Sequence, residues 1–115
     1  LTVCCDFGDE ILIPEPSYTN YNGFAVATGV KINPITTRLE NNWQLPSIEE
    51  IEKLITPKTK AFMICNPNNP TGKVYNEDEL KKLAYLANKH DLFLLADEVY
   101  REFIFSDEKH VSLLN

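Results

Sequence analysis

The stretch that decides the fold is Ala-Phe-Met-Ile-Cys, residues 61–65, an apolar run that no polar residue interrupts. A strand is continuously apolar when both of its faces are covered, as happens to a parallel strand between two layers of helices. Residues 92–96, Leu-Phe-Leu-Leu-Ala, repeat the pattern. Between the two runs, Asn76 and Glu79 form a capping box ahead of an apolar stripe, which predicts a helix.

The same alternation extends toward the N-terminus. Apolar runs at Glu10–Pro14 and Lys31–Ile35 predict two further strands, and Pro34 suits a strand at an edge of the sheet. A helix from Ser17 to about Thr28 is expected between them, with Ser17 as its cap and Gly29 ending it.

The middle of the chain continues this order. Residues 38–46 are predicted to form a polar loop, after which Ser47 and Glu50 make a second capping box. Thr56-Pro57 is expected to stop that helix. A β-α-β-α-β-α-β order with buried strands predicts an α/β fold, a mainly parallel sheet with helices packed on it. Residues 1–5 are predicted to be the tail of a further helix.

Composition narrows the class of protein. The 115 residues are 43% apolar and carry a net charge of −6, as in an ordinary globular chain. No basic run is present to neutralise phosphates, so a nucleic-acid partner is not expected. No stretch approaches the roughly 18 apolar residues that a membrane span needs. The three cysteines lack a zinc-binding spacing, so we expect reduced thiols in the cytoplasm and no metal site.

Polar and aromatic residues follow three of the predicted strands. They are Pro-Glu-Pro-Ser-Tyr at 14–18, Asn-Pro-Asn-Asn-Pro-Thr-Gly at 66–72 and Asp-Glu-Val-Tyr at 97–100. Open parallel sheets bind ligands beyond the carboxyl ends of their strands, and these ends share one edge. The sequence therefore predicts a ligand site where the three segments meet.

The order of residues within these segments resembles the pyridoxal-phosphate-dependent aminotransferases of classes I and II, which share fold type I. Asn-Pro-x-Asn-Pro-Thr-Gly and Asp-Glu-x-Tyr stand at the spacing that this family shows, and Gly8-Asp9-Glu10 through Tyr18 also matches it. The resemblance covers nearly the whole chain. It implies that residues 1–115 are a central fragment of the PLP-binding large domain of such an enzyme.

The resemblance also implies roles for four residues. Asp97 matches the carboxylate that keeps the pyridine nitrogen of the cofactor protonated, which makes pyridoxal phosphate an effective electron sink. Asn69 and Tyr100 match the pair that hydrogen-bonds the phenolic oxygen of the cofactor. Tyr18 matches the aromatic residue that stacks on the pyridine ring. Tyr21, one turn further along, is expected only to pack.

Expectations also follow for prolines, arginines and histidines. Pro16 and Pro70 match a cis-proline device of the family, so cis bonds are expected at Glu15–Pro16 and Asn69–Pro70. Arg38 and Arg101 are expected to be surface charges. His90 and His110 are expected to be solvated.

Some of the family's catalytic groups have no match in this sequence. The Schiff-base lysine stands in a Ser-x-x-Lys context downstream of Asp-Glu-x-Tyr, and no lysine here has that context. The phosphate-cradling loop, the phosphate arginine and the substrate-carboxylate arginine are also unmatched. The 115-residue chain by itself is therefore expected to be inactive, although the parent protein would be an enzyme.

The resemblance implies that the parent transfers an amino group from an L-amino acid to a 2-oxo acid, most like the aspartate or aromatic branch, as a homodimer. One alternative is a carbon–sulfur β-lyase of the same fold. That branch tends to carry His at two positions where this sequence has Asn68 and Tyr100. The sequence therefore favours amino-group transfer over elimination. Another alternative is the non-catalytic sensing module of a transcription regulator, for which an upstream DNA-binding domain would decide.

Overall fold

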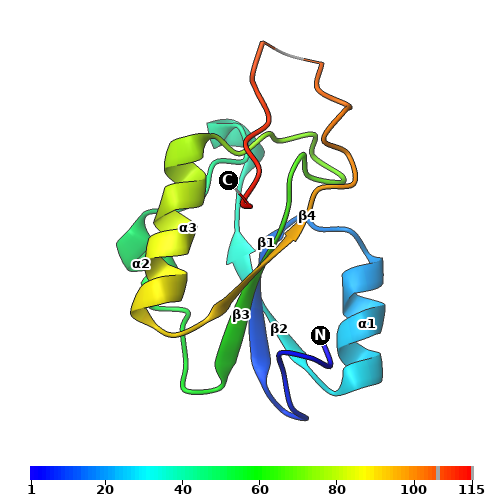
Figure 1. Ribbon diagram of the computed structural model, residues 1–115, viewed down its shortest axis with the longest axis vertical. Helices are drawn as coiled ribbons and strands as arrows, with labels where there is room; N and C mark the ends of the chain where they lie inside the picture. The colour runs from blue at the N-terminus through cyan, green and yellow to red at the C-terminus, as the bar shows by residue number, and fades with distance from the viewer. Residues whose placement is uncertain (106, 115) are drawn as a thin grey trace.

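Four parallel strands form one sheet in the computed structural model, which describes residues 1–105 and 107–114 (Figure 1). Their order across the sheet is β2-β1-β3-β4, and every neighbouring pair runs parallel. The strands are β1 (Glu10–Glu15), β2 (Lys31–Thr36), β3 (Thr59–Cys65) and β4 (Phe93–Asp97). The predicted α/β fold is confirmed, and β2 with its Pro34 lies at an edge as expected.

Helices cover both faces of this sheet. Helix α1 (Asn20–Thr28) joins β1 to β2 and lies on one face, as Figure 1 shows. Helices α2 (Ile48–Glu52) and α3 (Glu77–Lys89) lie on the opposite face, and a short 3-10 helix, η1 (Leu39–Asn41), interrupts the polar loop before α2. None of the helices in the described part of the chain is long and apolar enough to cross a membrane.

The apolar strands divide their side chains between two clusters. In β1, Ile11 and Ile13 pack in the cluster that contains Tyr21 of α1, whereas Leu12 packs in the cluster that contains Leu83 of α3. Such alternation is what the period of two of a strand produces. Both clusters exclude water, with Ile11 and Leu12 fully buried, which explains why residues 11–14 of β1 and 61–65 of β3 are all apolar.

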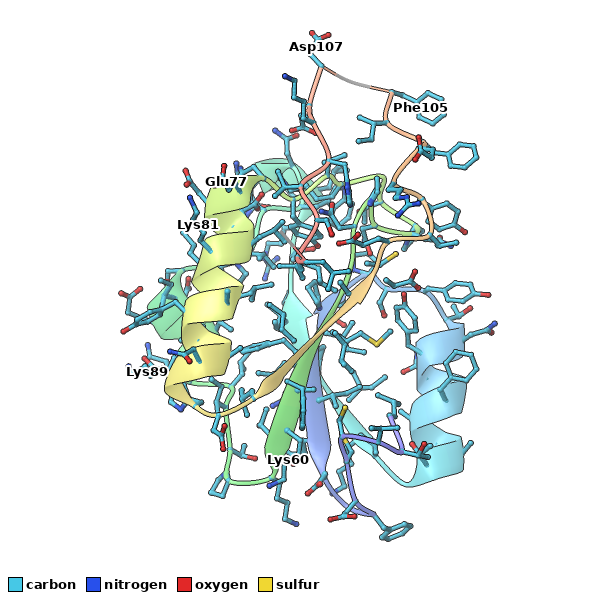
Figure 2. All side chains as sticks on the ribbon, viewed as in Figure 1. Lys60, Glu77, Lys81, Lys89, Phe105 and Asp107 are labelled. Atoms are coloured by element: carbon cyan, nitrogen blue, oxygen red, sulfur yellow. The ribbon has the colours of Figure 1, made fainter. Side chains whose placement is uncertain are left out.

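The two capping boxes form as the sequence predicts. The Asn76 side chain accepts a hydrogen bond from the Glu79 backbone amide at 2.9 Å, and the Glu79 carboxylate accepts one from the Asn76 amide at 3.1 Å. Ser47 and Glu50 make the same exchange ahead of α2. Along α3 the charged side chains of Glu77, Lys81 and Lys89 point away from the sheet (Figure 2), so this helix is amphipathic.

Three predicted boundaries are wrong. Helix α1 begins at Asn20, not at Ser17, because the carbonyls of residues 15–16 bond to other segments at the edge of the sheet. The Glu15 carbonyl accepts a hydrogen bond from the Thr37 amide, and the Pro16 carbonyl accepts one from the Asn68 side chain. Helix α2 ends at Glu52, and the residues up to Ile55 continue in turns.

The third wrong boundary is at the N-terminus. Residues 1–5 form a single turn closed by hydrogen bonds from the Cys4 and Cys5 amides to the Leu1 carbonyl, not the tail of a helix. That turn packs Leu1 and Cys5 against the α1 side of the sheet.

The strand order creates one position where a ligand site is expected. From β1 the chain crosses to β2 on one side, whereas β3 lies on the other side of β1. In open parallel sheets the connections at such a reversal leave the sheet in opposite directions and open a crevice beyond the strand ends. The segments after β1 and β3 therefore border this crevice.

Candidate functional site

An open cavity of about 310 Å³ lies at the carboxyl ends of β1, β3 and β4. We call it the strand-end pocket. Its walls are Tyr18, Tyr21, Cys65, Asn69, Asp97, Val99 and Tyr100. The pocket unites all four residues that the sequence singles out, Tyr18, Asn69, Asp97 and Tyr100, although they come from three separate segments.

Asp97 is the last residue of β4 and supplies the carboxylate of the pocket. One of its oxygens accepts a hydrogen bond of 2.7 Å from the hydroxyl of Tyr21, and the other accepts from the Val99 amide at 3.2 Å. Its backbone carbonyl accepts from the Asn66 amide at 2.9 Å. The carboxylate is therefore held at both oxygens before any ligand is present.

Tyr21 is a residue of the pocket for which the sequence predicted packing alone. It does pack, with only 3% of its surface exposed, but its hydroxyl also reaches Asp97. Burial, and then the bond to Asp97, raises the pKa of this phenol far above its usual range, so the hydroxyl keeps its proton. Nothing local in the sequence signals this, since the partner lies 76 residues away.

Tyr18 contributes an aromatic wall to the pocket. Its ring meets the ring of Tyr21 edge-on, with centroids 5.5 Å apart, and 37% of its surface remains exposed. The Tyr18 hydroxyl accepts a hydrogen bond of 2.7 Å from the Asn20 side chain. An edge-to-face pair fixes the orientation of both rings, so Tyr21 orients Tyr18 as well as Asp97.

Asn69 and Tyr100 form a pair of donors. The Asn69 side-chain amide lies 3.4 Å from the Tyr100 hydroxyl oxygen, and Tyr100 is 38% exposed. The two groups are close enough for both to donate to one acceptor atom of a ligand.

The three asparagines of the 66–72 segment each join it to a different part of the molecule. Asn66, at the end of β3, bonds to β4 through the Asp97 carbonyl. The Asn68 side chain donates to the Pro16 carbonyl at 3.1 Å and to the Thr71 hydroxyl at 2.8 Å. Asn69 reaches Tyr100. What looks like turn composition is thus the framework that brings the three strand ends together.

Cis peptide bonds occur at Glu15–Pro16 and Asn69–Pro70, as predicted, and also at Asn66–Pro67, which was not predicted. All three bonds belong to segments that border the pocket.

A larger hollow of about 730 Å³ is lined mainly by residues 67–74 and 103–105. It shares Asn69 and Tyr100 with the strand-end pocket, but neither Tyr18 nor Asp97 lines it. It therefore does not unite the predicted residues. Within residues 1–105 and 107–114, no group of three His, Cys, Asp or Glu side chains is placed to hold a metal ion.

The expectation that both histidines are solvated is wrong for His110, whose side chain is only 14% exposed. His90 is 29% exposed and lies 2.6 Å from a Glu52 carboxylate oxygen. Arg38 and Arg101 are exposed, as expected.

Comparison with known proteins identifies the family. The model of the family described as aminotransferase class I and II matches residues 1–115, the whole chain. The chain belongs to this family. Class I and II aminotransferases are pyridoxal-phosphate enzymes, so the resemblance seen in the motifs is confirmed.

Several aminotransferases are similar in sequence. The chain is 41% identical over 114 residues to an alanine aminotransferase of Mycobacterium tuberculosis, covering 98% of this chain and 26% of that protein. It is 41% identical over 106 residues to an aspartate aminotransferase of Pyrococcus abyssi, covering 92% of this chain and 27% of that protein. An aromatic-amino-acid aminotransferase of Thermococcus litoralis is also 41% identical, over 105 residues.

Solved aminotransferase structures share the fold. An alanine aminotransferase from Pyrococcus furiosus superposes with a TM-score of 0.87 at 38% identity, over 96% of this chain and 28% of that one. The Thermus thermophilus aspartate aminotransferase with maleate superposes with a TM-score of 0.88 at 35% identity, over 95% and 28% of the two chains. This aminotransferase chain thus spans about a quarter of the length of the relatives that it matches.

Proposed function

We propose that residues 1–115 are part of the PLP-binding large domain of an aminotransferase, and that the strand-end pocket receives the ring of pyridoxal phosphate. The observation that carries this proposal is the convergence of Tyr18, Asn69, Asp97 and Tyr100 on one cavity. Its volume, about 310 Å³, is within the range of small-molecule sites.

The chemistry of the pocket walls fits that ring. A carboxylate held at both oxygens suits a protonated ring nitrogen. Two adjacent donors, Asn69 and Tyr100, suit a phenolate oxygen. A half-exposed aromatic side chain, Tyr18, suits a flat ring.

Each residue has a stated task in this proposal. Asp97 accepts a hydrogen bond from the ring nitrogen and keeps the proton on that atom, because a nearby negative charge favours the protonated form. Tyr21 donates to Asp97 and fixes the direction of its carboxylate. Asn69 and Tyr100 donate toward the phenolic oxygen, and Tyr18 covers one face of the ring.

The cofactor supplies an electron sink for bonds at the α-carbon of an amino acid. The residues that would hold its phosphate, and the Schiff-base lysine, have no match among these 115 residues. We therefore propose that the chain by itself does not catalyse the reaction and that other parts of the parent protein supply these groups.

The parent is proposed to transfer an amino group from an L-amino acid to a 2-oxo acid. The relatives named above are alanine, aspartate and aromatic aminotransferases, which supports transfer over carbon–sulfur elimination or ligand sensing. We propose a cytoplasmic homodimer. The free thiols of Cys4, Cys5 and Cys65 agree with a reducing compartment, and exposed apolar side chains such as Phe7 and Phe105 agree with covered surfaces in an assembly.

The test is Asp97→Asn in the protein as its complete gene encodes it. We expect the rate of transamination to fall about a hundredfold or more, because asparagine carries no charge to hold the ring proton. Asp91→Asn is the matched control, since Asp91 is exposed and its φ of 54° also suits asparagine. Asp97→Asn turnover near that of the control would contradict the proposal.

A further inference from the structure

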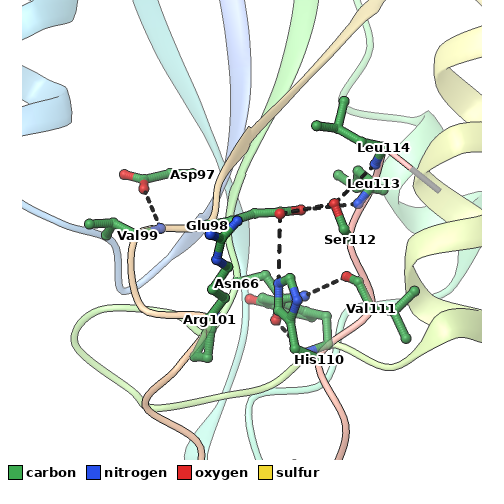
Figure 3. A network of polar contacts seen from close by, with 12 residues as sticks. Asn66, Asp97, Glu98, Val99, Arg101, His110, Val111, Ser112, Leu113 and Leu114 are labelled. Carbon is green, nitrogen blue, oxygen red and sulfur yellow. Dashed lines mark hydrogen bonds and ion pairs between the residues drawn. The ribbon is translucent and has the colours of Figure 1, made fainter.

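Two adjacent carboxylates leave the end of β4 toward opposite faces of the sheet. Asp97 points to the face covered by α1, where it meets Tyr21. Glu98 points to the other face and toward residues 110–114, which we call the strap (Figure 3). This divergence follows from the alternation of side chains along extended backbone.

Glu98 is bound to the strap by both of its oxygens. One accepts a hydrogen bond of 2.9 Å from the Ser112 hydroxyl, and the other accepts from the Leu113 amide at 3.0 Å. The Ser112 oxygen in turn accepts from the Leu114 amide at 3.2 Å. His110 lies 3.9 Å from the same carboxylate, whose side chain is only 15% exposed. Glu98 is thus a mostly enclosed charge with defined partners.

The strap is itself fixed to the body of the domain. Val111 and Leu113 pack against the apolar cluster between the sheet and α3. Asn66 is only 2% exposed. Its side chain donates a hydrogen bond of 3.4 Å to the Val111 carbonyl and accepts one of 3.0 Å from the Tyr75 amide. A group bonded to the strap is therefore bonded to a segment that packs on the body of the domain.

We propose that Glu98 is a positioning residue that sets the direction of Asp97. With Asp97 held by Tyr21 and Val99 on one face and Glu98 held by Ser112 and Leu113 on the other, the peptide between them cannot rotate without breaking hydrogen bonds to these carboxylates. Removal of Glu98 would leave the Leu113 amide and the Ser112 hydroxyl without their acceptor and would free this peptide. The consequence of this positioning for cofactor binding rests on the function proposed above.

The first test needs no cofactor. Hydrogen–deuterium exchange is measured for peptides covering residues 93–101 and 107–114 in the cofactor-free protein, encoded by its complete gene. Glu98→Ala should speed exchange in both peptides, Glu98→Gln should restore slow exchange in part, and Ser112→Ala should give a smaller change in the same direction. Glu102→Ala is the control, because Glu102 is exposed and only four residues away. Faster exchange confined to 107–114 would mean that Glu98 merely holds the strap, and would overturn the proposal.

The second test separates positioning from general loosening. The dissociation constant is measured for pyridoxal phosphate and for its analogue with carbon in place of the ring nitrogen. If Glu98 acts through Asp97, Glu98→Ala should weaken the binding of pyridoxal phosphate about tenfold, which is the usual cost of losing a residue that orients a ligand-binding group. The same substitution should weaken the binding of the analogue much less. Equal losses for both ligands would overturn the proposal. If the wild-type protein binds neither ligand, the proposed function fails, while the exchange experiment still decides the role of Glu98.

Discussion

The hydroxyl of Tyr21 donates a 2.7 Å hydrogen bond to the carboxylate of Asp97 across 76 residues of sequence. Tyr21 also packs edge-on against Tyr18. A single buried side chain on α1 therefore orients two walls of the strand-end pocket, which makes it the first target for mutation.

Tyr21→Phe keeps the ring and removes only the hydroxyl. Because a hydrogen bond to a charged group contributes about 1.5–3 kcal/mol, we expect the free energy of unfolding to fall by about 1–3 kcal/mol and the affinity for pyridoxal phosphate to fall as well. Urea unfolding and a binding titration measure the two effects. Tyr85→Phe is the control, since Tyr85 is 54% exposed on α3. The same result for both variants would show that the bond to Asp97 contributes nothing.

The same phenol predicts a dependence on alkaline pH. The pKa of Tyr21 is raised in the folded protein, whereas a tyrosine in the unfolded chain titrates near about 10. Its contribution to stability is fully present below that pH and is lost as the pH rises through the folded value. Unfolding free energies of the wild type should therefore fall more steeply above about pH 10 than those of Tyr21→Phe. Parallel curves would contradict this.

The ion pair between Lys73 and Glu79 is nearly enclosed and should matter for stability. Its atoms lie 3.0 Å apart, with 10% and 8% of the two side chains exposed, and Glu79 also completes the cap of α3. Lys73→Ala would leave the Glu79 carboxylate without its cation. We therefore expect the free energy of unfolding to fall by about 3 kcal/mol.

Lys81→Ala is the matched control for that experiment. It breaks the pair of Lys81 with Glu77, which points into solvent on the outer face of α3 (Figure 2). Exposed pairs contribute little, so the change in the urea midpoint should be much smaller than for Lys73→Ala. Equal urea midpoints for the two variants would show that burial of the Lys73–Glu79 pair does not increase its contribution to stability.

The 115-residue chain should show no transaminase activity and no stoichiometric attachment of pyridoxal phosphate to a lysine. None of its lysines stands in the sequence context of the family's Schiff-base lysine. The chain is mixed with pyridoxal phosphate and reduced with borohydride, and modified lysines are mapped by mass spectrometry. Full labelling of one lysine together with turnover of an amino acid would show that this chain supplies its own catalytic group.

Sequence alone determined the features that depend on neighbouring residues. The apolar runs at 61–65 and 92–96 predicted covered strands because two-sided burial demands uninterrupted apolar residues. The capping boxes of Asn76 and Ser47 were predictable because each is closed within one turn of helix. The resemblance of the motifs to the aminotransferase family pointed to Tyr18, Asn69, Asp97 and Tyr100. That their segments meet was predictable because the ends of parallel strands share one edge.

Only the tertiary structure decided which side chains meet across that edge. The partnership of Tyr21 with Asp97 and that of Glu98 with Ser112 join segments that no local pattern relates. The start of α1 at Asn20 also escaped prediction, because the carbonyls of residues 15–16 bond to distant segments and Ser17 is left outside the helix. A local sequence pattern predicts the backbone hydrogen bonds that neighbouring residues form with one another. The direction of a side chain in the pocket depends instead on residues that are distant in sequence and that only folding brings close.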